Sequence, residues 1–165
     1  MVFITRRERF NAAHKLFREE WSQEQNTAVF GKCANPNWHG HNYELFVTVK
    51  GEINPQTGFV VDLKDLRDII NKEVINKIDH SNINLDVDFM KGKLASTEVL
   101  AVEIWNQLLP HIEKDGVKLA KIHSKIYELN DGAATVEFDS DHHATNAHKV
   151  IDLSITKSVV GMLLT

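Results

Sequence analysis

The segment of residues 31–43, GKCANPNWHGHNY, contains a thiol and two closely spaced imidazoles, which together could perform chemistry. His39 and His41 are separated by one glycine, and Cys33 is the only cysteine of the chain. If a strand runs back to residue 39, both imidazoles project from the same face and could bind one metal ion. A catalytic zinc ion usually has three protein ligands and an open position. A third ligand must therefore come from elsewhere in the chain.

The third ligand is best sought at the end of the first predicted strand. His14 closes the motif FNAAH there, and a neighbouring antiparallel strand could bring it beside the pair. His80 is the alternative third ligand. Two ordinary surface histidines are the competing interpretation of the HGH motif, because so short a pattern is common in proteins.

The same segment predicts a reactive thiol. Cys33 lies in a polar, turn-like stretch after Lys32, and a positive neighbour lowers the pKa of a thiol and favours the thiolate. A thiolate could abstract a proton or attack as a nucleophile, although a free cysteine is more commonly a small buried apolar residue. Asp79 and His80 could likewise form a proton-transferring pair, or could simply be solvated.

Hydrophobic periodicity predicts the elements that must position these groups. Alternation indicates strands over 2–10, 43–51, 118–128 and 134–139, and residues 11–38 are expected to be irregular, with a helical turn near 21–26. Helical spacing predicts one helix from the N-cap Asp62 to about Lys77 and another beginning near Ser96. The order predicts an α+β domain: an antiparallel four-stranded sheet with two helices between strands 2 and 3, both on one face.

The composition is that of one globular domain. The chain has 165 residues, of which 42% are hydrophobic and 25% are charged. A net charge of -4 without a basic block argues against a nucleic-acid partner. No apolar leader and no long uncharged segment is present, so we expect a cytoplasmic protein without a membrane partner. The lone cysteine fits a reducing compartment, and the two open edges of such a sheet favour a homo-oligomer.

Six segments occur in an order that resembles one family. They are FNAAH, GKCANPNWHGHNY, NPQTGFVVDL, IDHSNIN, STEVLAVEIW and IYE, and they span residues 1 to about 129. In these motifs the chain is similar to the 6-pyruvoyl-tetrahydropterin synthases and to the 6-carboxy-tetrahydropterin synthases of queuosine biosynthesis.

The resemblance implies a tunnelling fold (T-fold), in which subunits join edge to edge into a barrel and two trimers stack as a hexamer. It implies active sites between subunits, each with a zinc ion (Zn2+). The implied metal ligands are His14, His39 and His41; the implied catalytic residues are Cys33, Asp79 and His80; and the implied pterin contacts are Glu128, Thr97 and Glu98.

The implied substrate is 7,8-dihydroneopterin triphosphate, with Cys33 and His80 moving protons and triphosphate leaving. The product is either 6-pyruvoyl-tetrahydropterin, for tetrahydrobiopterin, or 6-carboxy-tetrahydropterin, for queuosine. Five residues separate Cys33 from His39, as in the pyruvoyl branch, but many bacterial members with this spacing are assigned to the queuosine route, so both products stay open. A non-catalytic metal-binding T-fold protein is the alternative function. A cupin-like enzyme fits poorly, because two long helices interrupt the pattern of a barrel.

Two features depart from the family pattern. Leu129 follows Glu128 where a threonine or serine is usual. The chain also continues past the last predicted strand, so we expect a synthase domain over 1–138 and an extension over 139–165. The extension either docks on a neighbour or is poorly ordered, and His142, His143 and His148 in it are expected to be exposed or partly packed.

Overall fold

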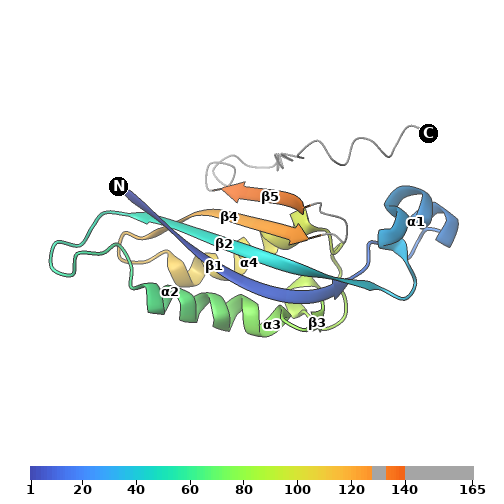
Figure 1. The fold of residues 1–165 in the computed structure, drawn as a ribbon, viewed down its shortest axis with the longest axis horizontal. Coiled ribbons are helices and arrows are strands. Elements are labelled where there is room, and N and C mark those ends of the chain that lie inside the picture. Colours follow the sequence, from blue (N-terminus) through green and yellow to red (C-terminus); the bar gives the residue numbers. More distant parts are fainter. Residues whose placement is uncertain (128–132, 140–165) are drawn as a thin grey trace.

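One five-stranded sheet is the framework of the computed structural model, which describes residues 1–127 and 133–139. Its strands are β1 (Val2–His14), β2 (His39–Gly51), β3 (Ser81–Asn82), β4 (Lys118–Tyr127) and β5 (Ala133–Asp139). They lie side by side in the order β3-β1-β2-β4-β5 (Figure 1). The four long strands pair antiparallel, whereas β3 pairs parallel with β1.

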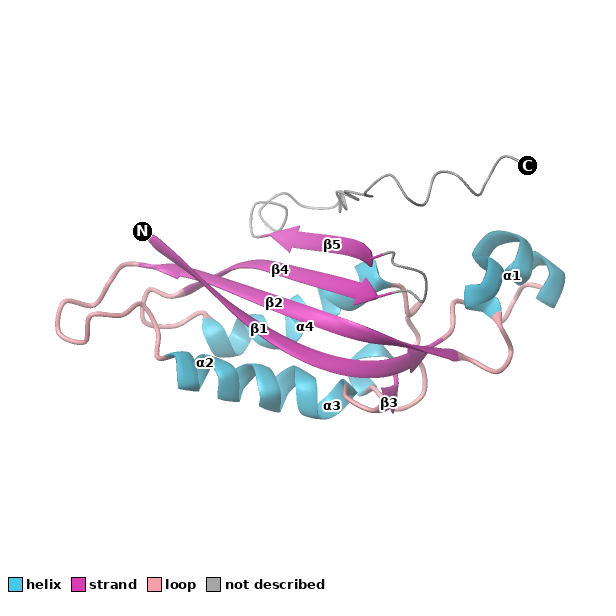
Figure 2. Cartoon of the chain, in the orientation of Figure 1, coloured by secondary structure: helices cyan, strands magenta, loops and turns pink. Residues whose placement is uncertain are grey.

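The longer helices cover one face of this sheet and leave the other uncovered. The helices are α1 (Gln23–Phe30), α2 (Leu63–Ile70), α3 (Asn76–Ile78) and α4 (Thr97–Ile112). Figure 2 shows α2, α3 and α4 along the same face, while α1 lies beyond the ends of β1 and β2. The predicted α+β class and the placement of the two main helices between the second and third long strands are therefore confirmed.

Two details of the sequence prediction were wrong. The sheet has a fifth strand, β3, whose two residues are too few to show an alternating pattern. Residues 11–38 are not a wholly irregular connection, because β1 continues to His14 and α1 follows with a capping box of Ser22 and Gln25. The predicted helix from Asp62 to about Lys77 is confirmed, and within it a π-helical turn over Asn71–Ile75 lies between α2 and α3.

The helix starts follow local capping rules. The Asp62 side chain accepts a hydrogen bond from the Lys64 backbone N–H and begins α2, as predicted. The Ser96 side chain accepts from the Val99 backbone N–H and begins α4. These caps fix the residues at which the two helices begin.

The core lies between the helices and the covered face of the sheet. On β2 the predicted apolar face is buried, and Trp105 of α4 packs edge-on against Phe138 of β5 with ring centroids 5.2 Å apart. The buried set on β2, α2 and α4 includes Tyr43, Leu45, Val47, Val49, Leu66, Ile70, Leu100, Ile104 and Leu108. Burial of this size gives β1 and β2 a rigid support for side chains at their ends.

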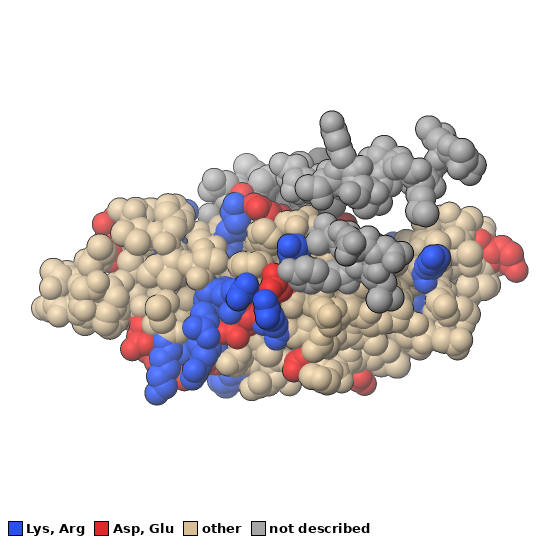
Figure 3. Space-filling model, viewed as in Figure 1, with Lys and Arg blue, Asp and Glu red and all other residues tan. Residues whose placement is uncertain are grey.

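The uncovered face of the sheet carries paired charges. Figure 3 shows basic side chains in a band across it, with acidic side chains between them. Arg9 Nη2 lies 2.9 Å from a carboxylate oxygen of Glu44, and Lys121 Nζ lies 2.7 Å from Glu137. No helix within 1–127 and 133–139 combines the length and apolarity needed to cross a membrane. Apart from Asp139, the predicted extension lies outside the described residues.

Candidate functional site

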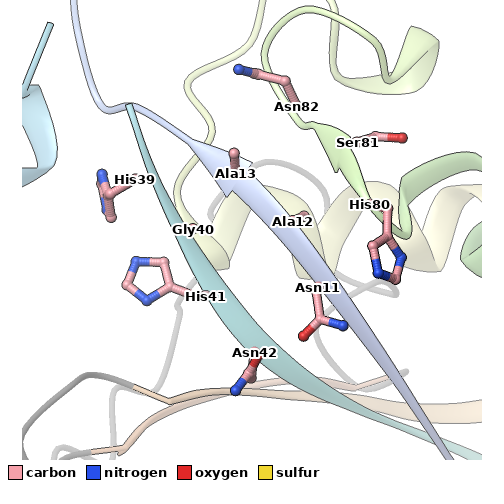
Figure 4. A pocket seen from close by; sticks show the side chains of 10 residues that line it. All are labelled: Asn11, Ala12, Ala13, His39, Gly40, His41, Asn42, His80, Ser81 and Asn82. Atoms are coloured by element: carbon pink, nitrogen blue, oxygen red, sulfur yellow. The ribbon is translucent and has the colours of Figure 1, made fainter. Parts of the chain in front are cut away.

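The antiparallel pairing of β1 with β2 brings three histidines together. His14 stands directly opposite His39, and Ala12 stands opposite His41. Because His39 and His41 alternate with Gly40, both project from the same side of β2 (Figure 4). One ring nitrogen of each imidazole lies within 4.8 Å of those of the other two. We call this trio the histidine cluster.

His14 is held as a neutral imidazole. Burial lowers its pKa to about 4, although a backbone hydrogen bond opposes the shift, and its side chain is almost wholly inaccessible. Its Nδ1 lies 2.7 Å from the carbonyl oxygen of Ala95, to which a neutral ring donates. Its Nε2 is buried and has no hydrogen-bond partner among the described residues. An imidazole oriented by a carbonyl, with a bare nitrogen facing two more imidazoles, is the donor arrangement that a metal ion needs.

Cys33 lies in a 3-10 turn over Gly31–Ala34 that is bonded to the chain just beyond β1. Its carbonyl oxygen accepts a hydrogen bond of 2.9 Å from the backbone N–H of Leu16, just beyond β1. Burial, and in addition the negative charge of Cys33, raises the pKa of Tyr43. The Tyr43 ring in turn lies 6.1 Å from the ring of His41. The half-buried thiol is therefore within electrostatic reach of the strand that carries the histidines.

Asn26 supports this position of Cys33, and no sequence motif singled it out. The side chain is fully buried in α1, and its Nδ2 donates to three backbone carbonyls: those of Arg18, Trp21 and Ser22. Its Oδ1 accepts from the Arg18 backbone N–H at 2.8 Å. These bonds fold the chain before α1 back onto the helix that leads into Cys33. An asparagine in a polar segment gives no signal of such burial in the sequence.

Asp79 and His80 form a contact at the edge of the sheet. His80 Nδ1 lies 3.0 Å from Asp79 Oδ2, while Asp79 Oδ1 accepts from the Asn11 backbone N–H at 2.8 Å. His80 has φ 58, and its backbone N–H donates to the Asn11 carbonyl at 2.7 Å. Its side chain is 78% exposed. The Asp79 carboxylate thus orients the His80 imidazole, whose Nε2 can exchange a proton with another molecule.

A cavity of about 740 Å³ is lined by His39, His41 and His80, and in Figure 4 the strands β1 and β2 run between His80 and the other two imidazoles. Its described lining residues are Asn11, Ala12, Ala13, His39, Gly40, His41, Asn42, His80, Ser81 and Asn82. Cys33 is not among them. The described lining of this cavity therefore includes His39, His41 and His80, but neither His14 nor Cys33.

The predicted pterin contacts are only partly described. Thr97 and Glu98 occupy the first turn of α4 and are half-buried, but neither belongs to the described lining of this cavity. Glu128, Leu129 and the histidines of the extension lie outside the described residues. His111 and His123 lie away from the cluster, beside Glu73 and Glu137 respectively.

Comparison with known proteins identifies the family. A family model described as 6-pyruvoyl tetrahydropterin synthase matches residues 3–149. The chain is 44% identical to 6-pyruvoyl tetrahydrobiopterin synthase of Homo sapiens over 105 residues, 64% of this chain and 72% of the relative. Identity to the Dictyostelium discoideum synthase of that name is 39% over 68% of this chain and 82% of the relative. The solved Caenorhabditis elegans 6-pyruvoyl tetrahydropterin synthase has 33% identity and a TM-score of 0.73, covering 84% of this chain and 94% of that one. The chain therefore belongs to the 6-pyruvoyl tetrahydropterin synthase family.

Proposed function

We propose that this protein is a zinc-dependent lyase that converts 7,8-dihydroneopterin triphosphate into a tetrahydropterin and releases triphosphate. The observation that supports it most strongly is the histidine cluster, with ring nitrogens within 4.8 Å of one another, beside the segment that carries Cys33. Relatives named 6-pyruvoyl tetrahydrobiopterin synthase, at 39% and 44% identity, support an enzyme of this class.

His14, His39 and His41 would hold the metal ion in this proposal. Three neutral imidazoles suit zinc and leave a position open for substrate. When bound, the ion would act as a Lewis acid toward a side-chain hydroxyl and make neighbouring protons easier to remove. The Ala95 carbonyl would keep His14 in the tautomer whose Nε2 faces the cluster.

Cys33 would be the base that removes a proton from the substrate side chain. Its turn is tied to Leu16 by a backbone hydrogen bond, so the thiol stays near the end of β1. Lys32 precedes it and favours the thiolate. A thiolate near neutral pH can take a proton and return it at a neighbouring atom.

His80 would carry the second proton transfer, with Asp79 orienting its ring. The 3.0 Å contact between Nδ1 and Oδ2 leaves Nε2 of His80 to exchange the proton. Because Cys33 does not line the cavity that His80 lines, we propose that a second copy completes each site. Nearly the whole outer edge of β1 lies outside its short pairing with β3, so edge-to-edge assembly into a hexamer of two stacked trimers is available.

The pterin ring would be held at the far end of the substrate. Glu128 would accept hydrogen bonds from ring N–H groups, and Thr97 with Glu98 would add contacts from the first turn of α4. The relatives' names favour the pyruvoyl product of tetrahydrobiopterin synthesis, and 6-carboxy-tetrahydropterin for queuosine is the second candidate product. We also propose that the catalytic domain covers 1–138 and that the enzyme acts in the cytoplasm.

The test is anaerobic incubation of the purified zinc-loaded protein with 7,8-dihydroneopterin triphosphate, followed by mass spectrometry. A pyruvoyl product with triphosphate is the expected result. A carboxy product with acetaldehyde would assign the queuosine branch instead. Zinc binding without any conversion of substrate would support the alternative of a non-catalytic metal-binding T-fold protein.

A further inference from the structure

A lysine lies between two aromatic rings immediately beyond the histidine cluster. Lys15 follows His14, and Trp38 precedes His39, while His14 and His39 are directly paired across β1 and β2. Lys15 Nζ lies 4.3 Å from the centroid of the Phe17 ring and 5.0 Å from that of Trp38. The positive charge therefore lies at the end of the paired strands β1 and β2, which carry the histidine cluster.

This charge is not neutralised by a carboxylate of residues 1–127 or 133–139, whereas the neighbouring cations are paired. Arg18 lies 3.7 Å from Glu20, and Lys93 lies 2.7 Å from Glu103. Aromatic faces attract an ammonium group without removing its charge. The ammonium of Lys15 therefore keeps N–H donors for an anion.

The backbone around the lysine is fixed from two sides. Asn84 accepts from the Lys15 backbone N–H at 3.0 Å and donates to the Lys15 carbonyl at 3.0 Å. Trp38 has φ 63, a left-handed conformation that bulky residues rarely adopt. Strained backbone of this kind persists where surrounding structure holds it, and it is concentrated at binding sites. Both features keep ring and ammonium in one arrangement.

A cavity of about 490 Å³ opens beside this lysine. Lys15, Arg18 and Lys93 line it with positive charge, and Glu19 and Glu20 add negative charge. Since Glu20 is paired with Arg18 and Lys93 with Glu103, Lys15 is the cation best placed to attract an added anion.

We propose that Lys15 binds the phosphate chain of the substrate in this cavity. The inference rests on the proposed function for the identity of the pterin. In that substrate the hydroxyls and the triphosphate belong to one short side chain, so the groups that hold them must be neighbours in the protein. Lys15 meets this condition because it adjoins His14, and charge-assisted hydrogen bonds to phosphate are strong.

The experiment compares Lys15→Met, which keeps an apolar stem without the charge, with Lys15→Arg and with Lys93→Met as a matched control from the same cavity. KM is measured with 7,8-dihydroneopterin triphosphate, and the Kd of inorganic tripolyphosphate is measured by calorimetry at low salt. We expect Lys15→Met to raise both constants about tenfold or more, the size of one lost charge-assisted hydrogen bond. Lys15→Arg should keep most of the affinity, and Lys93→Met should change both constants by less than about threefold.

Zinc content and circular dichroism establish that each variant is folded. If Lys15→Met does not fold, Lys15→Gln provides a second neutral side chain. Unchanged KM and Kd in the neutral variant would overturn the proposal, as would a wild-type protein that does not bind tripolyphosphate. If the wild type binds tripolyphosphate through Lys15 but converts no pterin, the anion site stands and the proposed function fails. If the protein converts the pterin and replacement of Lys15 leaves KM and Kd unchanged, the proposed function stands and the anion site fails.

Discussion

His14 and His39 face each other as paired residues of β1 and β2, with ring centroids 4.5 Å apart. The Ala95 carbonyl fixes the ring of His14 from the other side. Three clustered imidazoles are therefore held by the paired ends of β1 and β2.

Replacing His39 or His14 with alanine should abolish stoichiometric zinc binding and lower turnover more than a hundredfold, because two imidazoles cannot hold the ion tightly. Metal content by mass spectrometry and product formation are the measurements. Zinc should raise the melting temperature of the wild type and leave that of His39→Ala unchanged. His111→Ala, at the exposed end of α4, is the control and should retain metal and activity.

Cys33→Ala should keep zinc but lose turnover by a factor of about a hundred to ten thousand, the usual contribution of a positioned acid or base. The thiol is not one of the clustered nitrogen donors, so its removal leaves the metal ligands intact. Metal content and kcat are measured on the same sample. Undiminished kcat would exclude the thiol as the base, and loss of zinc would show that it contributes to the metal site.

Asp79→Asn should lower kcat by about tenfold to a hundredfold with little change in KM, because an amide cannot stabilise a charged His80 ring. The Asn11 backbone N–H can still donate to the amide oxygen, so the edge of the sheet should remain folded. Asp88→Asn is the control, since Asp88 is an exposed carboxylate paired with Lys91. A KM effect with unchanged kcat would instead assign Asp79 to substrate binding.

Asn26→Ala should destabilise the protein by about 2–4 kcal/mol, because buried backbone groups of residues 18–22 lose their partners. It should also lower kcat, since the turn that carries Cys33 follows α1 directly. Urea denaturation and steady-state kinetics are the measurements. Val29→Ala, on the exposed side of the same helix, should change neither value appreciably.

The stability of the metal-free protein should depend on pH through His14. Its pKa is about 4 when folded and 6.5 as the reference for an unfolded chain, so the unfolded state binds more protons between these values. The free energy of unfolding that neutral His14 contributes is fully present above about pH 6.5 and is lost as pH falls toward 4. At about pH 5 the loss is roughly 2 kcal/mol. The free energy of unfolding is measured by urea denaturation at about pH 7 and about pH 5. Between these pH values it should fall less for His14→Leu than for the wild type. Equal falls would contradict a buried neutral His14.

The long elements were predictable because their signals are local. Alternation of Tyr43, Leu45 and Val47 reports one buried face, and Asp62 and Ser96 mark helix starts that the structure retains. His39 and His41 could also be paired from the sequence, since a strand places residues two apart on one side. That Cys33 is reactive stays a prediction from its polar neighbours.

Only the tertiary structure decided which distant residues join these groups. His14 lies opposite His39 because of the register of β1 against β2. Asn26 is buried because residues 18–22 fold back onto it. The Trp38 ring contacts the Lys15 ammonium although the two residues lie far apart in the sequence. Strand β3 exists because β1 offers it an edge, not because two residues favour a strand. The sequence by itself determined periodicity, caps and donor types. Register and burial depend on the free energy of the whole packed domain, so no short stretch of sequence records them.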